Sequence, residues 1–587
     1  MSKSKQEFKY EQLIRLGISL SAERNLDKLL KDILDGALAL SQADAGTIYF
    51  KTDHDTLSFA IRSRSDDLPA FELPLHDPET GEPNNRYVSI YSALNGETVK
   101  IDDIYADIET PFDLEGTRRF DQETGYHTVS MITVPMIARD SKVIGVMQIV
   151  NATDIESGEC IPFSDDDTKL LEALASQAAV ALDNSNLMQA QQDLMDAFIK
   201  VIAGAIDAKS PYTGGHCARV PELSVMLAEA AEASEETLFK EFKFNEEEWR
   251  EFKIAGWLHD CGKVTTPEYV VDKDTKLQTI YNRIHEIRMR FEVLLRDEKI
   301  NYLEAIANIP DNTPDSNSAI RADLADQYNK KTEQLYRDFE FIATCNVGGE
   351  FMSDDAVDRL TRLSKISWTR HFDDRLGLSE MEKQYLKDIP KPDLPCTEQL
   401  LADKAEHIIK RSINSNHSGE SIHTVIPTPK YLFNRGELYN LSIRKGTLSD
   451  EDRFIINDHI VQTILMLKKL PFPESLARVT EYAGGHHEKM DGTGYPLGLS
   501  REELSLPARI MAIADIYEAL TASDRPYKKA KTLTESLKIM SFMVKDQHID
   551  ADLFRLFLTS GVYQKYADTF LDPSQIDEVD ISDYLPA

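Results

Sequence analysis

Two short motifs, separated by 227 positions from His259 to His486, constrain the fold of this chain more than any other feature. The first, HDCGK, spans residues 259–263 and ends the predicted helix EEEWREFKIAGWLHD. The second, GGHHEKMDGTGYP, spans residues 484–496 and contains the turn signals DG and GYP. A carboxylate such as Asp260 at the end of an apolar turn costs free energy unless it is paired or bound to a metal. We therefore expect the two motifs to meet at one polar centre.

Further candidate ligands lie in the same part of the chain. Asp515 interrupts the apolar helical stretch ARIMAIADIYEAL, where a buried, metal-bound carboxylate explains an acid better than a solvated one. His216 stands in PYTGGHCARV, where a new helix is expected to begin. Arg525, Lys528 and Lys529 are candidates for contacting a phosphate, and a solvated basic patch is the alternative.

In chain order these residues follow the pattern H…HD-x-GK…H…HHE-xx-DG-x-GYP…D, and the chain resembles the HD-GYP phosphohydrolases over roughly 200–300 and 425–570. Those proteins are helical and bind two or three divalent ions, and many hydrolyse the bacterial second messenger cyclic di-GMP. The resemblance implies two catalytic residues: Asp260 would bridge the metals, and Lys263 would contact a substrate phosphate. The metal ligands that it implies are His216, His259, Asp260, His459, His486, His487 and Asp515.

The residue types suit this chemistry. Imidazoles and carboxylates without thiolates favour Fe, Mn, Co or Zn, and the resemblance points to Fe or Mn. Two such ions neutralise phosphoryl oxygens and supply a water-derived nucleophile at neutral pH. Family members with three metals carry a carboxylate one turn before the first histidine, whereas Tyr212 stands there in this chain. We therefore expect two divalent metal ions.

The interval between the two motifs is longer than the family usually has. The Thr-Pro-x-Tyr pattern at residues 266–269 recurs at 428–431. The segment 285–425 between them is predicted to be a helical insertion that interrupts the catalytic domain.

The insertion leaves two candidates for the ligand between the motifs. The family places this histidine eleven positions after a leucine, which matches His459 after Leu448. His285 lies eight positions after Leu277. We prefer His459, and His285 is then a core or surface residue of a helix.

The N-terminal part of the chain has an α+β pattern. Residues from about 10 to 40 read as an amphipathic helix, and β-branched, alternating segments follow it. Strands are expected at residues 45–50, 57–62, 129–137 and 143–151.

The stretch 120–154 resembles the GAF domains of cyclic-nucleotide phosphodiesterases and cyclases, which often carry an N-K…F-x-x-x-D-E motif. Ala152 and Thr168 stand where that motif has Lys and Glu. A cyclic nucleotide, another small ligand or dimerisation alone are the open alternatives for this domain. The residues that match the motif, and are therefore candidates for binding a cyclic nucleotide, are Asn151, Phe163 and Asp167.

A long helix is predicted from about 165 to 208, because Gly204 is its first glycine and Pro211 the next proline. Ser164 and Asp167 form a capping-box-like start. One heptad register suits a parallel coiled coil in a homodimer, and the alternative is a helix packed on its own domains. That register contains Leu171, Leu174, Ala178, Ala181, Ser185, Met188, Gln192, Met195, Ile199, Ile202 and Ile206.

These features predict a multidomain chain. An α+β GAF domain with an antiparallel sheet and helices precedes a long linker helix and an all-α HD-type catalytic domain with a helical insertion. The expected boundaries are 1–19 for an N-terminal helix or tail, 20–185 for the GAF domain, 186–208 for the signalling helix, 209–575 for the catalytic domain with its 285–425 insertion, and 576–587 for a C-terminal tail.

Composition limits the partners. The net charge of −34 opposes binding to nucleic-acid polymers and to anionic lipid. No apolar run is long enough for a transmembrane helix, and the N-terminus lacks a signal-peptide pattern, so a cytoplasmic location is expected. Five scattered cysteines without a CxxC pair argue against a disulfide framework and against a thiolate zinc site.

The hypothesis that accounts for the most residues is hydrolysis of cyclic di-GMP to pGpG, and on to GMP in a second step, under control of a ligand at the GAF domain. A phosphohydrolase for another cyclic mono- or dinucleotide is not separable from it by sequence. A non-catalytic nucleotide-binding regulator should lack ligands, and none of the seven is missing. A purely structural sensor dimer leaves the GYP loop unexplained.

Overall fold

The computed structural model describes residues 2–23, 25–63, 72–139, 141–209, 215–309, 314–349, 351–411, 422–523 and 530–585. The chain divides into two compact units, Met1–Met195 and Asp196–Ala587, and helix α5 (Asp165–Asp207) continues through the boundary. Within the described ranges, no helix is both long and apolar enough to cross a membrane.

The first unit is built on a seven-stranded antiparallel sheet. The strand order is β3-β2-β1-β6-β5-β4, and β7 pairs with β6. This is the predicted α+β domain with an antiparallel sheet. Its elements are α1 (Ser2–Ala22), α2 (Leu26–Ser41), β1 (Ala43–Lys51), β2 (Thr56–Arg62), β3 (Glu72–Pro74), α3 (Val88–Asn95), β4 (Val99–Ile101), α4 (Glu115–Thr124), β5 (Met131–Ile137), β6 (Val143–Thr153), β7 (Cys160–Ile161) and the first part of α5.

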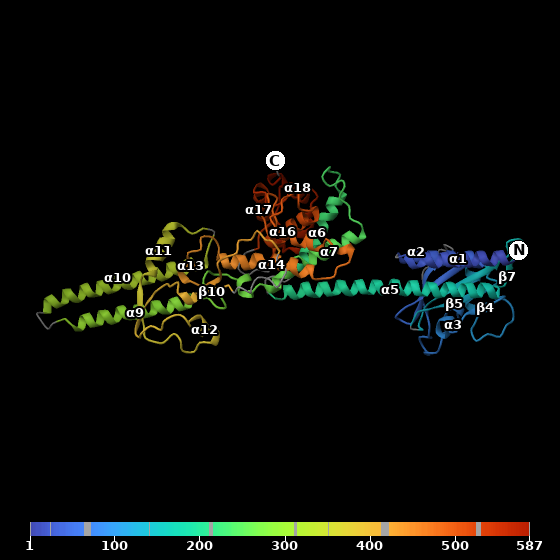
Figure 1. Cartoon of the computed structure of the whole chain (residues 1–587), viewed down its shortest axis with the longest axis horizontal. Helices are drawn as coiled ribbons and strands as arrows, with labels where there is room; N and C mark the ends of the chain where they lie inside the picture. Colours follow the sequence, from blue (N-terminus) through green and yellow to red (C-terminus); the bar gives the residue numbers. More distant parts are fainter. Residues whose placement is uncertain are drawn as a thin grey trace. The chain divides into compact units, whose positions relative to one another are not determined.

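Helices cover both faces of this sheet. Ile48 of β1 belongs to a core with Leu29 of α2 and Leu174 of α5. The next residue, Tyr49, packs on the other face with Ile90 of α3. This alternation follows from the period of two along a strand. In Figure 1, α1, α2 and α5 accordingly lie on one side of the strands and α3 on the other.

Helix α5 begins as predicted. The Ser164 hydroxyl accepts a hydrogen bond from the Asp167 amide at 3.1 Å, and the Asp167 carboxylate accepts one from the Ser164 amide at 3.2 Å. This reciprocal pair satisfies two of the amides that a helix start leaves unpaired. The helix then runs for 43 residues without a break.

The predicted coiled-coil register of α5 needs correction. Leu171, Leu174 and Ala178 are fully buried in the core of the first unit, and Ile199 and Ile206 are buried in the second. These positions pack within the chain because they face the side of the helix that its own units cover. Met188 and Ile202 of the predicted register are 50% and 48% exposed, and the apolar row one residue earlier along the helix is more exposed. It contains Leu187 at 60%, Leu194 at 57%, Phe198 at 59% and Val201 at 68% exposure.

The second unit is mainly helical. Helix α6 packs on α7 and α16, and α14 packs on α15 and on the 3-10 turn η1. Gly256 permits the first of these contacts, since a Cβ atom there would lie 3.2 Å from Pro221 Cβ. The described helices outside the insertion are α6 (His216–Ala233), α7 (Glu246–Leu258), η1 (Cys261–Thr265), α8 (Glu268–Val271), α13 (Glu437–Leu441), α14 (Asp450–Lys468), η4 (Glu474–Leu476), α15 (Val479–Gly484), α16 (Leu506–Thr521), α17 (Leu533–Lys545), α18 (Ala551–Thr559), α19 (Val562–Phe570), η5 (Pro573–Gln575) and η6 (Ile581–Asp583).

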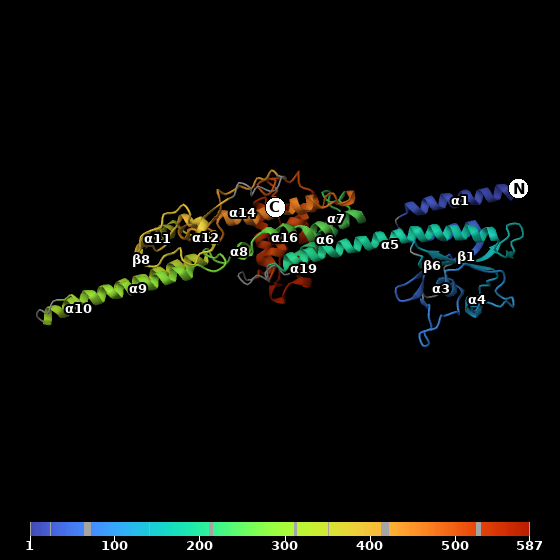
Figure 2. The same ribbon diagram turned by 60° about the horizontal axis from the view of Figure 1, so that its bottom comes forward.

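The insertion is not wholly helical. Figure 1 shows α9 and α10 side by side as two long helices, and in the turned view of Figure 2 they overlap. Two small antiparallel sheets, β8 with β9 and β10 with β11, accompany the helices and were not predicted, because strands of three or four residues carry too little periodic signal. The elements are α9 (Ile284–Ala307), α10 (Pro314–Val347), α11 (Asp354–Ser364), β8 (Ser367–Arg370), α12 (Glu380–Tyr385), β9 (Cys396–Gln399), η2 (Ala405–His407), β10 (Ile408–Lys410) and, after the predicted boundary, β11 (Tyr431–Asn434).

The recurring Thr-Pro-x-Tyr pattern adopts two different structures. Its first copy leads into the short helix α8, and its second copy leads into strand β11. The rings of Tyr269 and Phe433, which follow the two prolines, lie 6.1 Å apart. The segment between the two copies therefore begins and ends at neighbouring places.

Candidate metal centre

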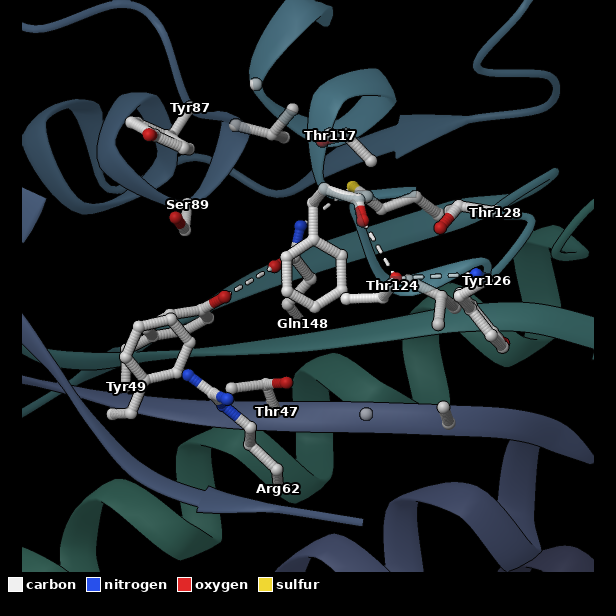
Figure 3. Close-up of a pocket in the computed structure, with 18 of the residues that line it drawn as sticks. Thr47, Tyr49, Arg62, Tyr87, Ser89, Thr117, Thr124, Tyr126, Thr128 and Gln148 are labelled. Atoms are coloured by element: carbon white, nitrogen blue, oxygen red, sulfur yellow. Dashed lines mark hydrogen bonds between the residues drawn. The ribbon is translucent and has the colours of Figure 1, made fainter. Parts of the chain in front are cut away.

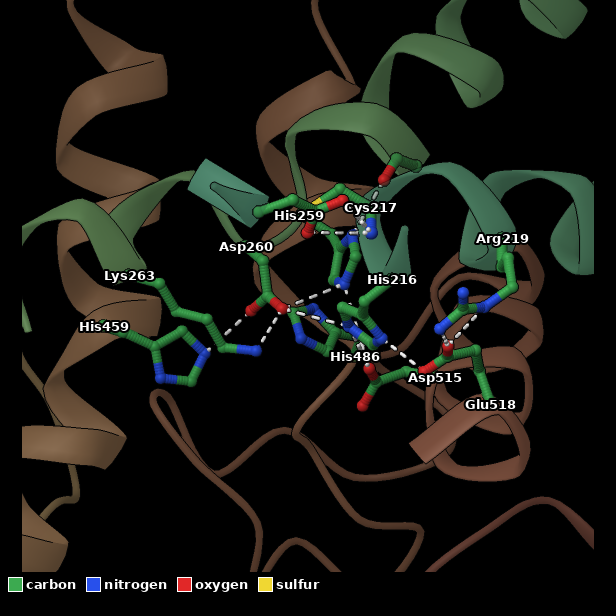
Figure 4. A network of polar contacts seen from close by, with 12 residues as sticks. His216, Cys217, Arg219, His259, Asp260, Lys263, His459, His486, Asp515 and Glu518 are labelled. Atoms are coloured by element: carbon green, nitrogen blue, oxygen red, sulfur yellow. Dashed lines mark hydrogen bonds and ion pairs between the residues drawn. The ribbon is translucent and has the colours of Figure 1, made fainter. Parts of the chain in front are cut away.

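Five separate regions of the second unit deliver histidine and aspartate side chains to one place (Figure 4). His216 is the first residue of α6, and His259 and Asp260 follow the end of α7. His459 lies within α14, the consecutive His486 and His487 follow α15, and Asp515 lies within α16. The structure thus brings together all seven residues that the sequence singled out.

Asp260 occupies the middle of this cluster. Its Oδ2 atom lies 3.2 Å from His216 Nε2 and 3.3 Å from His259 Nε2, while its Oδ1 atom lies 3.2 Å from His459 Nε2. The side chain is 2% exposed. A carboxylate whose two oxygens face different histidines has the arrangement that a bridge between two ions requires.

The potential ligand atoms form two groups that share Asp260. In each group the atoms lie within 4.8 Å of one another. One group contains Asp260, His459, His486 and His487, and the other contains His216, His259, Asp260 and Asp515.

Three of the histidines are oriented in the same way. The Nδ1 atoms of His259, His459 and His486 each face the backbone carbonyl oxygen three residues earlier. The distances are 2.7 Å from His259 to Gly256 and 2.6 Å from His486 to Ala483. A carbonyl can only accept, so Nδ1 of each ring carries a proton, and Nε2 is the nitrogen that remains for a metal ion. Nε2 is the atom that faces the centre of the cluster.

The cluster contains buried polar atoms without hydrogen-bond partners among the described residues. They are Nε2 of His216, His259 and His486, together with Oδ1 of Asp260. Buried polar groups are ordinarily satisfied, and a set of orphaned ligand atoms facing one point is what a metal site looks like without its ion. The donor set of imidazole and carboxylate fits divalent transition metals. The residues therefore fit the divalent metals that an HD domain implies.

Burial disfavours the charged form of each side chain in the centre, and neighbouring charges of opposite sign offset this effect. Burial disfavours ionised Asp260, but Lys263 and His259 hold the pKa of its carboxyl well below the usual range. Burial also lowers the pKa of His259, yet the Asp260 carboxylate outweighs this and raises that pKa to about 9. Burial and the charge on His259 lower the pKa of His486 to about 4. At neutral pH His486 is thus a neutral imidazole that can offer a lone pair.

Lys263 is held at the edge of the cluster. Its ammonium pairs with Asp260 Oδ2, and its side chain is 27% exposed, so it is accessible from solvent while it faces the centre. The backbone of this turn is anchored by Lys209, whose ammonium donates to the carbonyl oxygens of Lys263 at 3.2 Å and Thr266 at 2.7 Å. The sequence pattern did not single out Lys209.

Close backbone packing explains why a glycine follows the HD pair. A Cβ atom at Gly262 would lie 1.9 Å from the His459 carbonyl oxygen, so any larger residue would push η1 away from α14. The Gly262 amide also donates to the Thr463 hydroxyl at 2.9 Å. This contact sets the distance between Asp260 and His459.

The GYP loop is built around Glu488. Its carboxylate accepts hydrogen bonds from the amides of Leu497, Gly498 and Leu499 at 2.6 to 3.1 Å. Within the loop, the Tyr495 ring stacks on the His487 ring with centroids 4.9 Å apart. Glu488 belongs to the HHE motif, but nothing in the sequence showed what it would hold.

The structure separates the two candidates for the intervening histidine. His459 lies beside Asp260, and its Nε2 atom is also 3.2 Å from that of His487. His285 is exposed near the start of α9, and its Nδ1 atom lies 2.7 Å from an Arg288 nitrogen. The predictions that concern Tyr212, Arg525, Lys528 and Lys529 lie outside the described residues.

The first unit contains a separate cavity of about 370 Å³ (Figure 3). Its wall combines aromatic rings such as Tyr49 and Phe59 with hydroxyl and amide groups, including Gln148, whose carbonyl accepts from the Tyr49 hydroxyl at 3.1 Å. Among the described lining residues, Arg62 carries the only charged side chain. The volume lies within the range typical of small-molecule sites.

The three residues predicted for a GAF ligand lie elsewhere in the unit. The Asn151 side chain pairs with the Val129 amide at 2.7 Å and the His127 carbonyl at 2.8 Å, and Phe163 belongs to the core under α5. Asp167 pairs with Lys9 at 2.7 Å in addition to capping α5. None of the three is among the residues described as lining the cavity.

Two models of protein families match separate parts of this chain. Residues 25–182 match the model of the GAF domain, and residues 395–553 match a model of the HD domain. The crystal structure of the GAF domain/HD domain protein from Geobacter sulfurreducens is 20% identical, covering 29% of this chain and 98% of that chain with a TM-score of 0.21.

Two curated relatives are bacterial phosphodiesterases. Cyclic di-GMP phosphodiesterase PA4108 of Pseudomonas aeruginosa is 38% identical over 121 residues, which is 20% of this chain and 28% of that protein. The 3'3'-cGAMP-specific phosphodiesterase 1 of Vibrio cholerae is 38% identical over 118 residues, which is 20% of this chain and 26% of that protein. The matches thus span little more than a quarter of the relatives' own length. The chain carries a GAF domain within residues 25–182 and a domain of the HD family whose matched part is residues 395–553.

Proposed function

We propose that this chain is a metal-dependent phosphodiesterase that hydrolyses cyclic di-GMP to pGpG and, in a second step, to GMP. The observation that carries the proposal is the pair of ligand groups sharing Asp260, with orphaned Nε2 atoms turned toward one another. Relatives whose names describe cyclic dinucleotide phosphodiesterases support the same class of substrate.

The residues divide the work between metal binding and phosphate binding. His216, His259 and Asp515 would hold one ion and His459, His486 and His487 the other, with Asp260 between them. When bound, divalent ions such as Fe or Mn neutralise phosphoryl oxygens and make water a nucleophile at neutral pH. The carbonyl contacts at Nδ1 of His259, His459 and His486 leave Nε2 of each ring as the nitrogen that can bind a metal.

Lys263 supplies the accessible positive charge beside this centre. On substrate binding its ammonium can exchange Asp260 for a phosphate oxygen without leaving the edge of the cluster. Without the Lys263 contact, the Asp260 carboxylate would keep only its neighbours in the cluster of potential metal ligands. Both residues are therefore proposed as catalytic, as the sequence predicted.

A purified, Mn²⁺-loaded protein should be assayed with cyclic di-GMP, 3'3'-cGAMP, cyclic di-AMP, cyclic AMP and cyclic GMP. We expect hydrolysis of cyclic di-GMP that Asp260→Ala abolishes and that His285→Ala, a matched histidine away from the centre, leaves intact. Faster hydrolysis of 3'3'-cGAMP would favour the other substrate. Equal rates for the wild type and Asp260→Ala would contradict the mechanism, and metal binding without hydrolysis of any nucleotide would favour a regulator.

We also propose that a small ligand in the cavity of the first unit regulates the enzyme. Aromatic rings, hydroxyl groups and one guanidinium suit a planar, anionic molecule such as a cyclic nucleotide. Calorimetry of the full chain with cyclic AMP and cyclic GMP tests this. The cavity variant is Gln148→Leu, and Asn151, which does not line the cavity, is not substituted. Heat that is the same for the wild type and for Gln148→Leu would place binding outside the cavity.

We propose a homodimer through the exposed row of α5. Val180, Leu187, Leu194 and Val201 repeat every seven residues. Asn184, Gln191 and Phe198 alternate with them, so the face has the heptad pattern of a two-stranded coiled coil with polar residues in single core positions. None of these seven residues is charged, so a second copy of the same face meets no repulsion. We also propose the domain boundaries that the sequence predicts, including the insertion at residues 285–425.

A further inference from the structure

One imidazole of the centre is supported differently from three of the others. His259, His459 and His486 are each oriented by a carbonyl of their own segment. His216 begins α6, and its Nδ1 atom contacts the Glu518 carboxylate of α16 at 2.5 Å. Its orientation thus depends on a residue 302 positions away.

Glu518 is itself held in place. Its side chain is completely buried, and its second oxygen accepts hydrogen bonds from Arg219 Nε at 2.8 Å and Nη2 at 2.6 Å. Arg219 lies one turn after His216 on the same helix, so α6 grips the carboxylate from two sides. Burial disfavours the charged form, but His216 and Arg219 keep the pKa of Glu518 below its usual value. A charged, doubly bound carboxylate in this position cannot rotate away from the imidazole.

The other side of His216 faces the metal group. Its Nε2 atom lies 3.2 Å from Asp260 Oδ2 and 3.3 Å from Asp515 Oδ1. Asp515 and Glu518 are three residues apart on α16, so they share one helix face. That face carries the potential ligand Asp515 and the carboxylate that orients the potential ligand His216. Both ring nitrogens of His216 are therefore placed by α16.

We propose that Glu518 is a positioning residue that sets the metal affinity of the group formed by His216, His259, Asp260 and Asp515. The proposal rests on the metal centre of the proposed function. A carboxylate at Nδ1 fixes the tautomer of a metal-binding histidine and increases its basicity, and loss of such a partner costs about 10- to 100-fold in metal affinity. The group formed by Asp260, His459, His486 and His487 has no contact with Glu518 among those described, so its affinity is independent of this residue.

The test is a Mn²⁺ titration of the full-length protein, followed by equilibrium dialysis and elemental analysis. The variants are Glu518→Gln and Glu518→Asp, which keeps a negative charge near Arg219 but is too short to hold His216. Glu251→Gln is the matched control, because Glu251 is also a buried carboxylate of the second unit and accepts from a backbone amide, that of Arg478. Thermal unfolding in EDTA shows whether each variant is folded.

The wild type and Glu251→Gln should bind two Mn²⁺ ions per chain. Both Glu518 variants should bind one ion with unchanged affinity and the second about 10- to 100-fold more weakly, with native unfolding temperatures in EDTA. Two unchanged ions in both variants would overturn the inference, and so would equal weakening of both ions. A wild type that binds no metal would instead contradict the proposed function.

Discussion

The Nε2 atom of His459 and the Oδ1 atom of Asp260 lie 3.2 Å apart, although 199 positions separate the two residues in the chain. The contact exists because η1 and α14 pack closely at Gly262, where only a glycine fits. The insertion lies between the two residues in sequence, yet the chain returns to these helices close to where it left them, near Tyr269 and Phe433. A long insertion is therefore compatible with an intact centre.

This contact predicts which histidine binds metal. His459→Ala should lower Mn²⁺ binding to about one ion per chain, because it removes one ligand of the group that contains His486 and His487. His285→Ala should keep both ions, since the His285 side chain is exposed and its ring contacts Arg288, away from the centre. Elemental analysis of the two variants decides. Full metal content in His459→Ala together with loss in His285→Ala would reverse the assignment.

Glu488 predicts a stability effect in the GYP loop. Glu488→Gln should lower the free energy of unfolding by about 2 kcal/mol, because a charged acceptor of three backbone amides is replaced by a neutral one. Urea unfolding of the metal-free protein measures this change. Glu503→Gln, which alters an exposed carboxylate that accepts from the Ser500 amide at the start of the next turn, is the control and should cost less. If Glu488→Gln and Glu503→Gln lowered the free energy of unfolding equally, Glu488 would have no special role in the loop.

Lys276 predicts a pH dependence of stability. It is buried and donates to the carbonyl oxygens of Leu441 and Ile443, and burial lowers its pKa to about 8. The unfolded chain has the ordinary lysine pKa of about 10.4, so between these values the unfolded state binds more protons. Stability therefore rises with pH from about 8 to 10.4, by up to about 3 kcal/mol.

Lys276→Met removes this rise. Urea unfolding of the metal-free protein at pH 7 and pH 10 should show a smaller difference for Lys276→Met than for the wild type. Lys410→Met removes an exposed lysine of β10 and should behave as the wild type does. The prediction fails when both variants follow the wild-type pH dependence.

The exposed row of α5 predicts the register of the dimer. Leu194→Glu should convert a dimer to a monomer in light scattering, because it places like charges opposite each other in an apolar seam. Gln192→Glu adds the same charge to an exposed position of the originally predicted register and should leave the dimer intact. If only Gln192→Glu dissociated the dimer, the dimer would form through the register that contains Gln192. A monomeric wild type would contradict the proposed homodimer.

Much of the fold follows from local sequence. Alternation predicted β1, β2, β5 and β6 of the sheet, whereas the short strands β3, β4 and β7 were not predicted. The Ser164–Asp167 pair predicted the start of α5, and the absence of Pro before Pro211 predicted its approximate length. The prediction of a GAF domain followed by a helical HD domain is confirmed. These properties depend on neighbouring residues, whose geometry a helix or strand sets by itself.

The sequence by itself predicted which types of side chain form the centre, namely imidazoles and carboxylates. It also placed a glycine, Gly262, where the backbones of η1 and α14 come into close contact. Only the tertiary structure decided which side chains meet. It placed His459 and not His285 beside Asp260, set Glu518 against His216, and turned a different row of α5 toward solvent. The physical reason is that such pairings arise from packing between helices that are distant in the chain, and no local pattern records which faces will be covered.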